Sequence, residues 1–333
     1  MEKIKVAVAG LGRIGKIHLK NLCRNFPELE VIGVMDVADE SKAIADSFNV
    51  PVFTKNFDDL LTLGGLNAVV ICSPTDTHAD YSIRAAKAGK SVFCEKPLDL
   101  SVSRIKEVLQ VVSEAGVKLM LGFNRRFDPE FLRIRELVLA GAVGDSQIIK
   151  ITSRDPGPPP ISYIRVSGGM FLDMTIHDFD MARYISGKEV AEVYAKAAVK
   201  VDPEIGHAGD VDTAVITLTF EDGSMAVIDN SRRAVYGYDQ RLEVFGSKGM
   251  VQADNNFPNN HKLYTREGVS GDLPLFFFLE RYDASYKLEM GEFVKALATG
   301  TEMPVNGSDG LKSVLIALAA QKSLAENKPV KVE

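Results

Sequence analysis

Cysteine is scarce in this 333-residue chain, which contains only Cys23, Cys72 and Cys94. Their number is odd and no two form a C-x-x-C pair, which argues against a disulfide framework and for reduced thiols in the cytoplasm. Long apolar runs are missing too, since LFFFL at 275–279 and VLIALAA at 314–320 are far too short to cross a bilayer. No basic stretch followed by an apolar one opens the sequence, so we expect no signal peptide.

Positive charge is not in excess either. Lysine and arginine number 39 against 45 acidic residues, and a net charge of -6 gives no sign of the basic surface that nucleic-acid binding requires. With 46% hydrophobic residues, the chain has enough apolar side chains and enough length for two domains. We therefore expect a globular cytoplasmic protein whose partners include neither nucleic acid nor membrane.

The first third of the chain alternates strand-like and helix-like segments. Apolar runs rich in β-branched residues predict strands at Ile4–Ala9, Val31–Met35, Ala68–Cys72, Ser91–Cys94 and Lys118–Leu121. Amphipathic stretches predict helices at Ile14–Asn25, Ser41–Phe48, Ala79–Ala88 and Ser103–Glu114. Repeated strand–helix units form a parallel sheet with helices on both faces. The sequence thus predicts an α/β fold with a Rossmann dinucleotide-binding domain over residues 1–121.

The pattern changes after Gly122. Further helices are predicted at Pro129–Ala140, Met170–Ile185, Ala284–Thr299 and Gly310–Glu326. Further strands are predicted at Ser146–Arg154, Val190–Val201, Val211–Phe220, Ser224–Arg232, Arg241–Gly246 and Met250–Asp254, with a hairpin turn at 221–223. This order predicts an α+β domain over residues 122–333 with a largely antiparallel open sheet. Whether the last helix packs back on the first domain stays open.

The sequence GLGRIG, from Gly10 to Gly15, follows the first predicted strand and opens the first predicted helix. In such a loop Gly10 permits a tight turn, Gly12 lets the backbone approach a pyrophosphate, and Gly15 lets helix and strand pack closely. The helix N-terminus then favours the phosphate charge. The predicted cofactor contacts of this loop are Gly10, Gly12, Arg13, Ile14 and Gly15.

Asp36 follows the second predicted strand, about 20 residues after the last glycine of the loop. An acid at this position hydrogen-bonds a ribose 2′-hydroxyl and repels a 2′-phosphate. The sequence therefore predicts NAD as the cofactor, while Arg13 and Lys42 keep some use of NADP open.

Three segments leave the carboxyl ends of later strands, at 73–78, 95–97 and 122–125. Ligands of an open parallel sheet bind beyond these ends, so we expect all three segments to line one edge of the cleft. Lys96 would face the nicotinamide there and polarise a substrate oxygen or hold a proton. For His78, direct contact and a capping or packing role both stay open. The predicted cofactor contacts in these segments are Ser73, Pro74, Thr75, His78, Glu95 and Lys96.

The second half contains GGMFLDMTIHDFD, which ends at Asp180. Asp173 and His177 are four residues apart and share one face of the predicted helix, which Asp180 and Tyr184 extend. Histidine suits proton transfer near neutral pH, and a carboxylate one turn earlier can orient it. Alcohol oxidation needs such a group, because the hydroxyl must lose its proton as hydride leaves carbon.

A zinc site could be drawn from Asp173, His177 and a distant Cys94 or His78. These residues lack the compact spacing of zinc motifs, so we expect no metal in the catalytic site.

Three motifs together resemble those of the glucose–fructose oxidoreductase and inositol dehydrogenase family, Gfo/Idh/MocA. They are GLGRIG at 10–15, CEKP at 94–97 and GGMFLDMTIHDFD at 168–180, and the resemblance covers essentially the whole chain. Within the family the chain is most similar to inositol 2-dehydrogenases, on the segments GFNRRFD at 122–128, SRDPGPPP at 153–160, YIRVSGGMFLDMTIHD from 163 and RRAVYGYDQR at 232–241.

The resemblance implies a catalytic set of Lys96, Asp173 and His177. His177 would accept the proton, Lys96 would bind and polarise the reacting oxygen, and Asp173 would hold the array. The resemblance also implies a cis Lys96–Pro97 bond and a homotetramer formed through the sheet of the second domain. The implied substrate contacts are Lys96, Asn124, Arg125, Asp155, Asp173, His177 and Tyr236.

The activity that the resemblance implies is NAD-dependent oxidation of myo-inositol to 2-keto-myo-inositol (scyllo-inosose). Two alternatives stay open: an NAD(P)-dependent dehydrogenase of another cyclitol or sugar, and a non-catalytic nucleotide-binding regulator. A regulator could lose Lys96 or His177 without harm, so the presence of both favours an enzyme.

Overall fold

The computed structural model describes residues 3–333 and divides the chain into two compact units. The first unit comprises the chain up to Asn124 together with Ser285–Lys312, and the second comprises Arg125–Ala284 and Ser313–Glu333. The predicted division differs in placing 122–124 and 285–312 in the second domain. Apolar periodicity reveals a helix but not which sheet it covers, so the sequence could not assign this returning segment. Residues 1 and 2 of the predicted first domain lie outside the described residues.

The first unit is built on a six-stranded parallel sheet in the order β3-β2-β1-β4-β5-β6. The strands are β1 (Ile4–Ala9), β2 (Leu29–Met35), β3 (Phe53–Thr54), β4 (Ala68–Ile71), β5 (Ser91–Glu95) and β6 (Leu119–Gly122). The order reverses between β1 and β4, which is where such sheets bind ligands. The predicted Rossmann architecture is confirmed, and only the two-residue β3 was not predicted.

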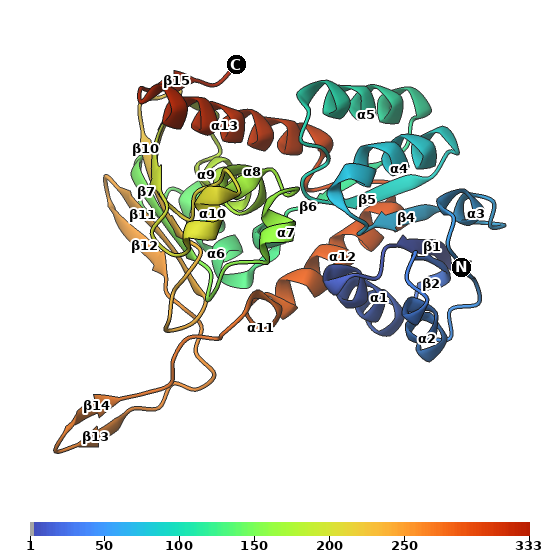
Figure 1. Ribbon diagram of the computed structural model, residues 1–333, viewed down its shortest axis with the longest axis horizontal. Helices are drawn as coiled ribbons and strands as arrows, with labels where there is room; N and C mark the ends of the chain where they lie inside the picture. The colour runs from blue at the N-terminus through green and yellow to red at the C-terminus, as the bar shows by residue number, and fades with distance from the viewer. Residues whose placement is uncertain (1–2) are drawn as a thin grey trace. The chain divides into compact units, whose positions relative to one another are not determined.

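Helices follow most of these strands and cover the sheet (Figure 1). They are α1 (Arg13–Asn25), α2 (Glu40–Ser47), α3 (Phe57–Leu61), α4 (Thr75–Lys87) and α5 (Val102–Ala115). α4 begins at Thr75 rather than at the predicted Ala79, because Thr77 bonds back to the Pro74 carbonyl through both its amide and its hydroxyl. This earlier start places Thr75 and His78 within the helix.

The returning segment adds α12 (Asp283–Thr299) to the first unit from Ser285 onward. Its Phe293 ring meets the Phe93 ring of β5 at 5.6 Å between centroids, and both side chains are fully buried. Farther on, Leu121 donates its amide hydrogen to the Val305 carbonyl at 3.1 Å. The segment therefore completes the core of the nucleotide-binding unit.

The second unit is built on a seven-stranded sheet in the order β12-β11-β7-β10-β9-β8-β15. The strands are β7 (Ser146–Arg154), β8 (Val190–Ala198), β9 (Thr213–Phe220), β10 (Met225–Ser231), β11 (Asp239–Gly246), β12 (Gly249–Ala253) and β15 (Val330–Lys331). Every neighbouring pair is antiparallel except β7 with β10. The predicted, largely antiparallel sheet and the β9–β10 hairpin are confirmed.

Helices α9 and α13 lie on one side of this sheet (Figure 1). The helical segments are η1 (Asn124–Phe127), α6 (Pro129–Leu139), α7 (Ile161–Ile164), α8 (Gly169–Asp173), α9 (Ile176–Ser186), α10 (Pro203–His207), α11 (Phe278–Arg281) and α13 (Gly307–Glu326). The last helix, α13, has its first residues in the first unit and the remainder in the second, where Ser323 accepts from the Ala195 amide of β8. No helix of residues 3–333 is long and apolar enough to span a membrane.

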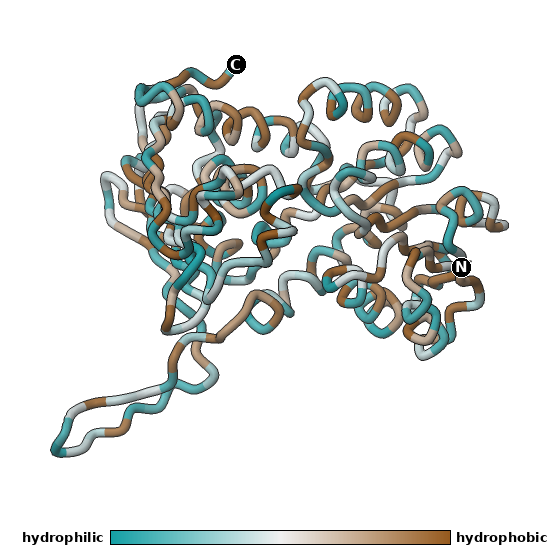
Figure 2. Tube along the Cα trace, in the orientation of Figure 1, coloured by the Kyte–Doolittle hydropathy of each residue, from teal (hydrophilic) through white to brown (hydrophobic). Residues whose placement is uncertain are grey.

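A two-stranded arm, β13 (Leu263–Thr265) and β14 (Gly268–Ser270), extends from the second unit. Short hydrophobic segments lie between longer hydrophilic and neutral ones along its tube (Figure 2), and large apolar side chains such as Leu263 and Tyr264 are exposed. The sequence prediction missed this arm, because its strands are only three residues long.

The predicted helix Met170–Ile185 is wrong in one respect, because the structure divides it between α8 and α9. The amide of Thr175 bonds to the Met170 carbonyl, five residues back, and so leaves the regular helical ladder. The buried Thr175 hydroxyl instead donates to Asn230 of β10 at 2.6 Å. Asp173 therefore ends α8 and His177 is the second residue of α9, so the two residues do not share a face of one continuous helix.

Candidate active site

The three glycines of the β1–α1 loop occupy the positions that their predicted roles require. Gly10 has a φ of +92°, and a Cβ there would lie 2.6 Å from the Ser73 nitrogen. A Cβ on Gly15 would lie 1.9 Å from the Gly10 carbonyl oxygen, so only glycine allows this helix and loop to approach. Around Gly12 there is open space with no atom within 4 Å of such a Cβ. A pyrophosphate fits this cradle at the N-terminus of α1.

Asp36 lies directly after β2 and holds the glycine loop. Its Oδ2 accepts from the Leu11 amide at 2.5 Å and its Oδ1 from the Ala38 amide at 2.8 Å. Each carboxylate oxygen has a second lone pair, so acceptor capacity remains for ribose hydroxyls. The geometry suits the predicted ribose contact and adds a loop-anchoring role.

His78 is 2% exposed and lies between two loops of the predicted cleft edge. Its Nδ1 is 2.8 Å from the Pro97 carbonyl oxygen, and its Nε2 is 2.8 Å from that of Ser73. Burial lowers the pKa of the imidazole against the opposing effect of these carbonyls. Because both nitrogens face main-chain oxygens, the packing role left open by the sequence is favoured over direct contact.

The Lys96–Pro97 peptide bond is cis, as the resemblance implied. Lys96 is half-buried directly after β5, at the carboxyl edge of the sheet. The neighbouring Glu95 turns toward α1, where its Oε1 is 2.7 Å from Nε2 of His18. Asn124, also beyond a strand end, is 3% exposed, and its Nδ2 has no hydrogen-bond partner among the described residues. Such a buried, unsatisfied donor is suited to a ligand.

Asp173 is held from two sides in the second unit. Its Oδ1 accepts from the Tyr163 hydroxyl at 2.8 Å, and its Oδ2 lies 3.5 Å from Nη1 of Arg232. Only 13% of the Asp173 side chain is exposed. His177, half-buried, follows at the start of α9. The break between α8 and α9 therefore presents a fixed carboxylate and an imidazole within five residues of chain.

Arg232 and Tyr163 were not predicted as site residues. Arg232 is 1% exposed and also lies 3.6 Å from Asp210, measured between Nη2 and Oδ2. Its position directly after β10 was a usable signal, since the strand-end rule was applied only to the first domain. Tyr163 lies outside every predicted helix and strand, so the sequence offered no comparable signal for it.

Asp155 belongs to the same cluster of charges. Burial raises the pKa of its carboxyl to about 6, Arg232 and then Arg125 oppose this rise, and Asp173 adds to it. Two carboxyl groups and an arginine therefore share one environment, in which Asp155 is more easily protonated than an exposed aspartate. The predicted contacts Asp155 and Asp173 lie together in the second unit.

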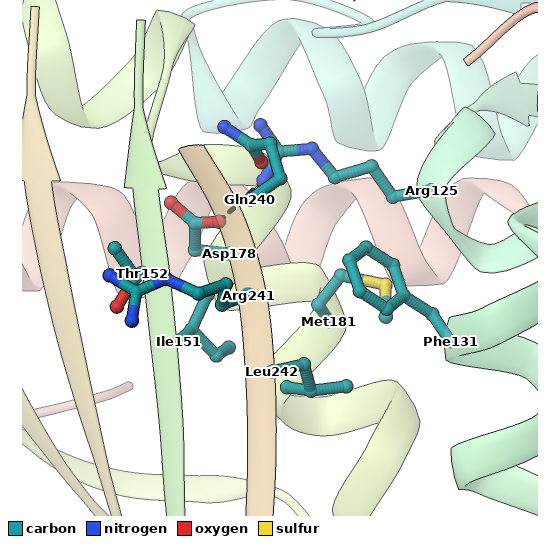
Figure 3. Close-up of a pocket in the computed structure, with 9 residues that line it drawn as sticks. All are labelled: Arg125, Phe131, Ile151, Thr152, Asp178, Met181, Gln240, Arg241 and Leu242. Carbon is teal, nitrogen blue, oxygen red and sulfur yellow. Dashed lines mark hydrogen bonds and ion pairs between the residues drawn. The ribbon is translucent and has the colours of Figure 1, made fainter. Parts of the chain in front are cut away.

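Arg125 is close enough to Asp155 to lower its pKa, but its hydrogen bonds go to other residues (Figure 3). Its Nη1 donates to Asp178 at 2.6 Å and its Nη2 to Ser153 at 3.2 Å, and all three residues are buried. The adjoining cavity measures about 10 Å³, roughly the space of one water molecule. This geometry favours a structural role for Arg125 over the predicted substrate contact.

Tyr236 also lies apart from Asp173. Its hydroxyl donates to Asp239 at 2.6 Å and accepts from Arg154 at 3.1 Å. Arg154 alternates with the buried Ser153 along β7, so it points to the sheet face that the helices leave uncovered. The Tyr236 hydroxyl is thus bonded to Asp239 and Arg154, and its contact with the substrate stays a prediction.

Asp180 and Tyr184 do not extend a catalytic stripe. Asp180 is buried and receives two hydrogen bonds from Arg126, at 2.7 and 2.5 Å, and that guanidinium covers the Tyr184 ring. The contacts of Asp180 and Tyr184 with Arg126 join α9 to η1.

Two family models match the chain. Residues 4–123 match the oxidoreductase family with an NAD-binding Rossmann fold, and residues 131–252 match the GFO/IDH/MocA C-terminal domain. The first match agrees with the glycine cradle and Asp36, so the predicted cofactor, NAD, is confirmed.

Full-length relatives extend the comparison. A myo-inositol 2-dehydrogenase of Thermotoga maritima is 49% identical over 99% of both chains, and an inositol 2-dehydrogenase of Rhizobium meliloti is 44% identical over 99% of both. The crystal structure of scyllo-inositol dehydrogenase from Lactobacillus casei, with bound NAD(H) and scyllo-inositol, superposes with a TM-score of 0.92. It is 32% identical and covers 99% of both chains. With the glycine cradle, the cis Lys96–Pro97 step and both domain matches in place, this chain belongs to the Gfo/Idh/MocA family of NAD-binding oxidoreductases.

Proposed function

We propose that this protein is an NAD-dependent inositol 2-dehydrogenase that oxidises myo-inositol to 2-keto-myo-inositol. The observation that carries the proposal is the cluster of Asp155, Asp173 and Arg232, with His177 four residues after Asp173. A ring of hydroxyl groups requires several hydrogen-bond donors and acceptors, which this cluster supplies. Full-length relatives named for inositol oxidation support the choice of substrate.

In the proposed reaction, His177 accepts the proton of the substrate hydroxyl while the C–H bond breaks and a C=O bond forms. Asp173, fixed by Tyr163 and Arg232, orients this array. Lys96 binds the same oxygen and stabilises the negative charge that develops on it. NAD, when bound, supplies the acceptor for the hydride. The proposal requires Lys96 and His177 to act on one substrate molecule.

The residues of the first unit have a separate task. Gly10, Gly12 and Gly15 hold the pyrophosphate at α1, and Asp36 binds the ribose. His78 ties the segment before α4 to Pro97 and so fixes the position of Lys96. Asn124 offers its buried amide to the substrate.

The test is an assay of NADH formation with myo-inositol, scyllo-inositol, glucose and xylose, each with NAD and with NADP. We expect the highest kcat/KM for myo-inositol with NAD. A preference for scyllo-inositol, the ligand in the Lactobacillus casei structure, would move the assignment to another cyclitol. Turnover of none of these polyols would contradict the proposal as a whole.

We further propose a homotetramer in the cytoplasm. The uncovered face of the second unit's sheet carries exposed apolar side chains at Val215, Met225, Phe245 and Met250. Phe245 pairs with Met250 of β12 and with Ile148 of β7, and Ile148 pairs with Met225 of β10, so apolar side chains cross four neighbouring strands. Burial against another subunit would remove it from water.

A further inference from the structure

Glu289 is a fully buried acid that the proposed reaction does not use. It lies on α12, in the segment that returns to the first unit, and is 0% exposed. Neither carboxyl oxygen has a hydrogen-bond partner among the described residues. A buried charge without a partner costs several kcal/mol, so this side chain requires an explanation.

Two other polar side chains lie beside it. His18 of α1 and Glu95 of β5 are joined at 2.7 Å, and each of these three residues has a ligand-type atom within 4.8 Å of the others. His18 is 0% exposed, and its Nδ1 also lacks a hydrogen-bond partner among the described residues. Three elements distant in sequence thus bring one imidazole and two carboxyl groups together in the core.

Two further titratable side chains of the described residues, Cys72 and Tyr286, lie beside this cluster, and neither is a cation. Cys72, after β4, is a neutral thiol, because burial first and then the charge of Glu95 raise its pKa well above the usual range. Tyr286, one turn earlier on α12, packs edge to face against His18, with 5.7 Å between the ring centroids. Burial and then the negative charge of Glu95 raise the pKa of Glu289 well above its ordinary value.

We propose that Glu289 is a positioning residue that carries a proton beside the Glu95–His18 pair and so keeps a second negative charge out of this core. Glu95 immediately precedes Lys96, and its carboxyl would lie 2.8 Å from a Cβ placed on Gly122 of β6. A second charge here would repel Glu95 from His18 and displace the Glu95–Lys96–Pro97 segment. The neutral acid therefore secures the strand end from which Lys96 acts.

The decisive variant is Glu289→Gln, which keeps the shape but cannot ionise. Glu292→Gln is the matched control, since Glu292 lies on the same helix and pairs with Lys295 near the surface. Thermal unfolding of the full-length protein is followed from pH 5 to pH 8 at one protein concentration, with and without EDTA.

The pKa of Glu289 is higher in the folded protein than in the unfolded chain. Glu289 ionises on unfolding but not in the folded protein, so its contribution to stability falls as the pH rises above about 4.3. For one such proton, the unfolding constant of the wild type rises relative to Glu289→Gln by up to about tenfold per pH unit. We therefore expect the stability of Glu289→Gln to increase relative to that of the wild type as pH rises. The stability of Glu292→Gln should change with pH as that of the wild type does.

Two results would overturn the proposal. If the stability of Glu289→Gln fell relative to that of the wild type as pH rises, the folded protein would favour the ionised form of Glu289. A wild-type midpoint that EDTA lowers, with no such fall in Glu289→Gln, would assign the cluster to a divalent cation. If the Gln variant does not fold, the infrared carbonyl band of a protonated carboxylic acid in the wild type at pH 7 decides, and its absence contradicts the proposal.

An activity measurement tests the positioning role and rests on the proposed function, whereas the unfolding measurements do not. Glu289→Ala opens a cavity beneath the Lys96 segment, and we expect kcat to fall by about 10-fold to 100-fold. Glu289→Gln should restore most of that loss. Equal losses in both variants would contradict the positioning role, while no turnover by the wild type would contradict only the proposed function.

Discussion

Arg232 lies with Nη1 3.5 Å from Oδ2 of Asp173, and its side chain is 1% exposed. We expect Arg232→Ala to lower kcat/KM for the polyol by about a hundredfold, because Asp173 and Asp210 lose their common cation and Asp173 shifts. The free energy of unfolding should fall by about 3–5 kcal/mol, the cost of breaking a buried pair. Kinetics are measured well below the unfolding midpoint of the variant.

Arg233→Ala is the matched control, since the neighbouring Arg233 is exposed. It should behave as the wild type, and Arg232→Lys should recover part of the stability. Full activity of Arg232→Ala would contradict the proposed role of Arg232 in holding Asp173.

Lys96 and His177 carry the proposed proton and oxygen chemistry. Lys96→Ala and His177→Ala should each lower kcat by at least about a hundredfold, the scale of a lost acid–base group. Stopped-flow measurement of NADH formation checks this prediction. Lys106→Ala and His207→Ala are controls, because both side chains are exposed. Near-normal turnover in either site variant would exclude that residue from its role.

Asp36 is expected to set the preference for NAD. Asp36→Ala removes the ribose acceptor and also the bond to the Leu11 amide, so NAD affinity should fall and the NAD-to-NADP ratio of kcat/KM should drop. Asp46→Ala is a suitable control, since Asp46 lies on the surface of α2 and pairs with Lys42. An unchanged cofactor ratio would count against the ribose contact.

Asp155 should make stability depend on pH. Its pKa of about 6 in the folded protein exceeds the value near 3.9 of an unfolded chain. The resulting stabilisation is complete below about pH 3.9 and is lost as pH rises through 6. The free energy of unfolding of Asp155→Asn, measured in urea, should therefore increase relative to that of the wild type between pH 4 and pH 7. The control Asp145→Asn, at an exposed position, should show no such increase. Parallel curves for all three proteins would refute the raised pKa.

The apolar sheet face offers a test of assembly. Phe245→Lys places a charge opposite Met250, and we expect light scattering to show a smaller oligomer for this variant than the tetramer proposed for the wild type. Leu139→Lys also adds a charge at an exposed apolar position, but on α6, and should leave the mass unchanged. A monomeric wild-type protein in solution would contradict the proposed tetramer.

Much of the first unit could be predicted, because its fold follows short local patterns. Strand periodicity and the GLGRIG loop specify β1, α1 and β2 without reference to distant residues. The family and NAD follow from the same motifs, and the comparisons confirm both. The fate of α12 could not be predicted, since its apolar residues would cover either sheet equally well.

The candidate site was predicted less completely. Asp173 and His177 were identified from their chemistry and spacing, but the Thr175–Asn230 bond that breaks the helix between them joins residues far apart in sequence. Arg125 and Tyr236 were chosen as polar residues in resembling segments, and sequence alone could not show which polar partners they bind. The catalytic and binding roles therefore remain predictions.

The route of the chain through α12 has a consequence for biosynthesis. A ribosome delivers β1 to β6 first, yet the helix that covers Phe93 emerges only after more than a hundred further residues have been made. Part of the core of the nascent nucleotide-binding sheet is therefore uncovered, and accessible to chaperones, while the second unit is translated. We therefore expect a chain that is terminated before α12 to carry the GLGRIG loop without the complete core of the first unit.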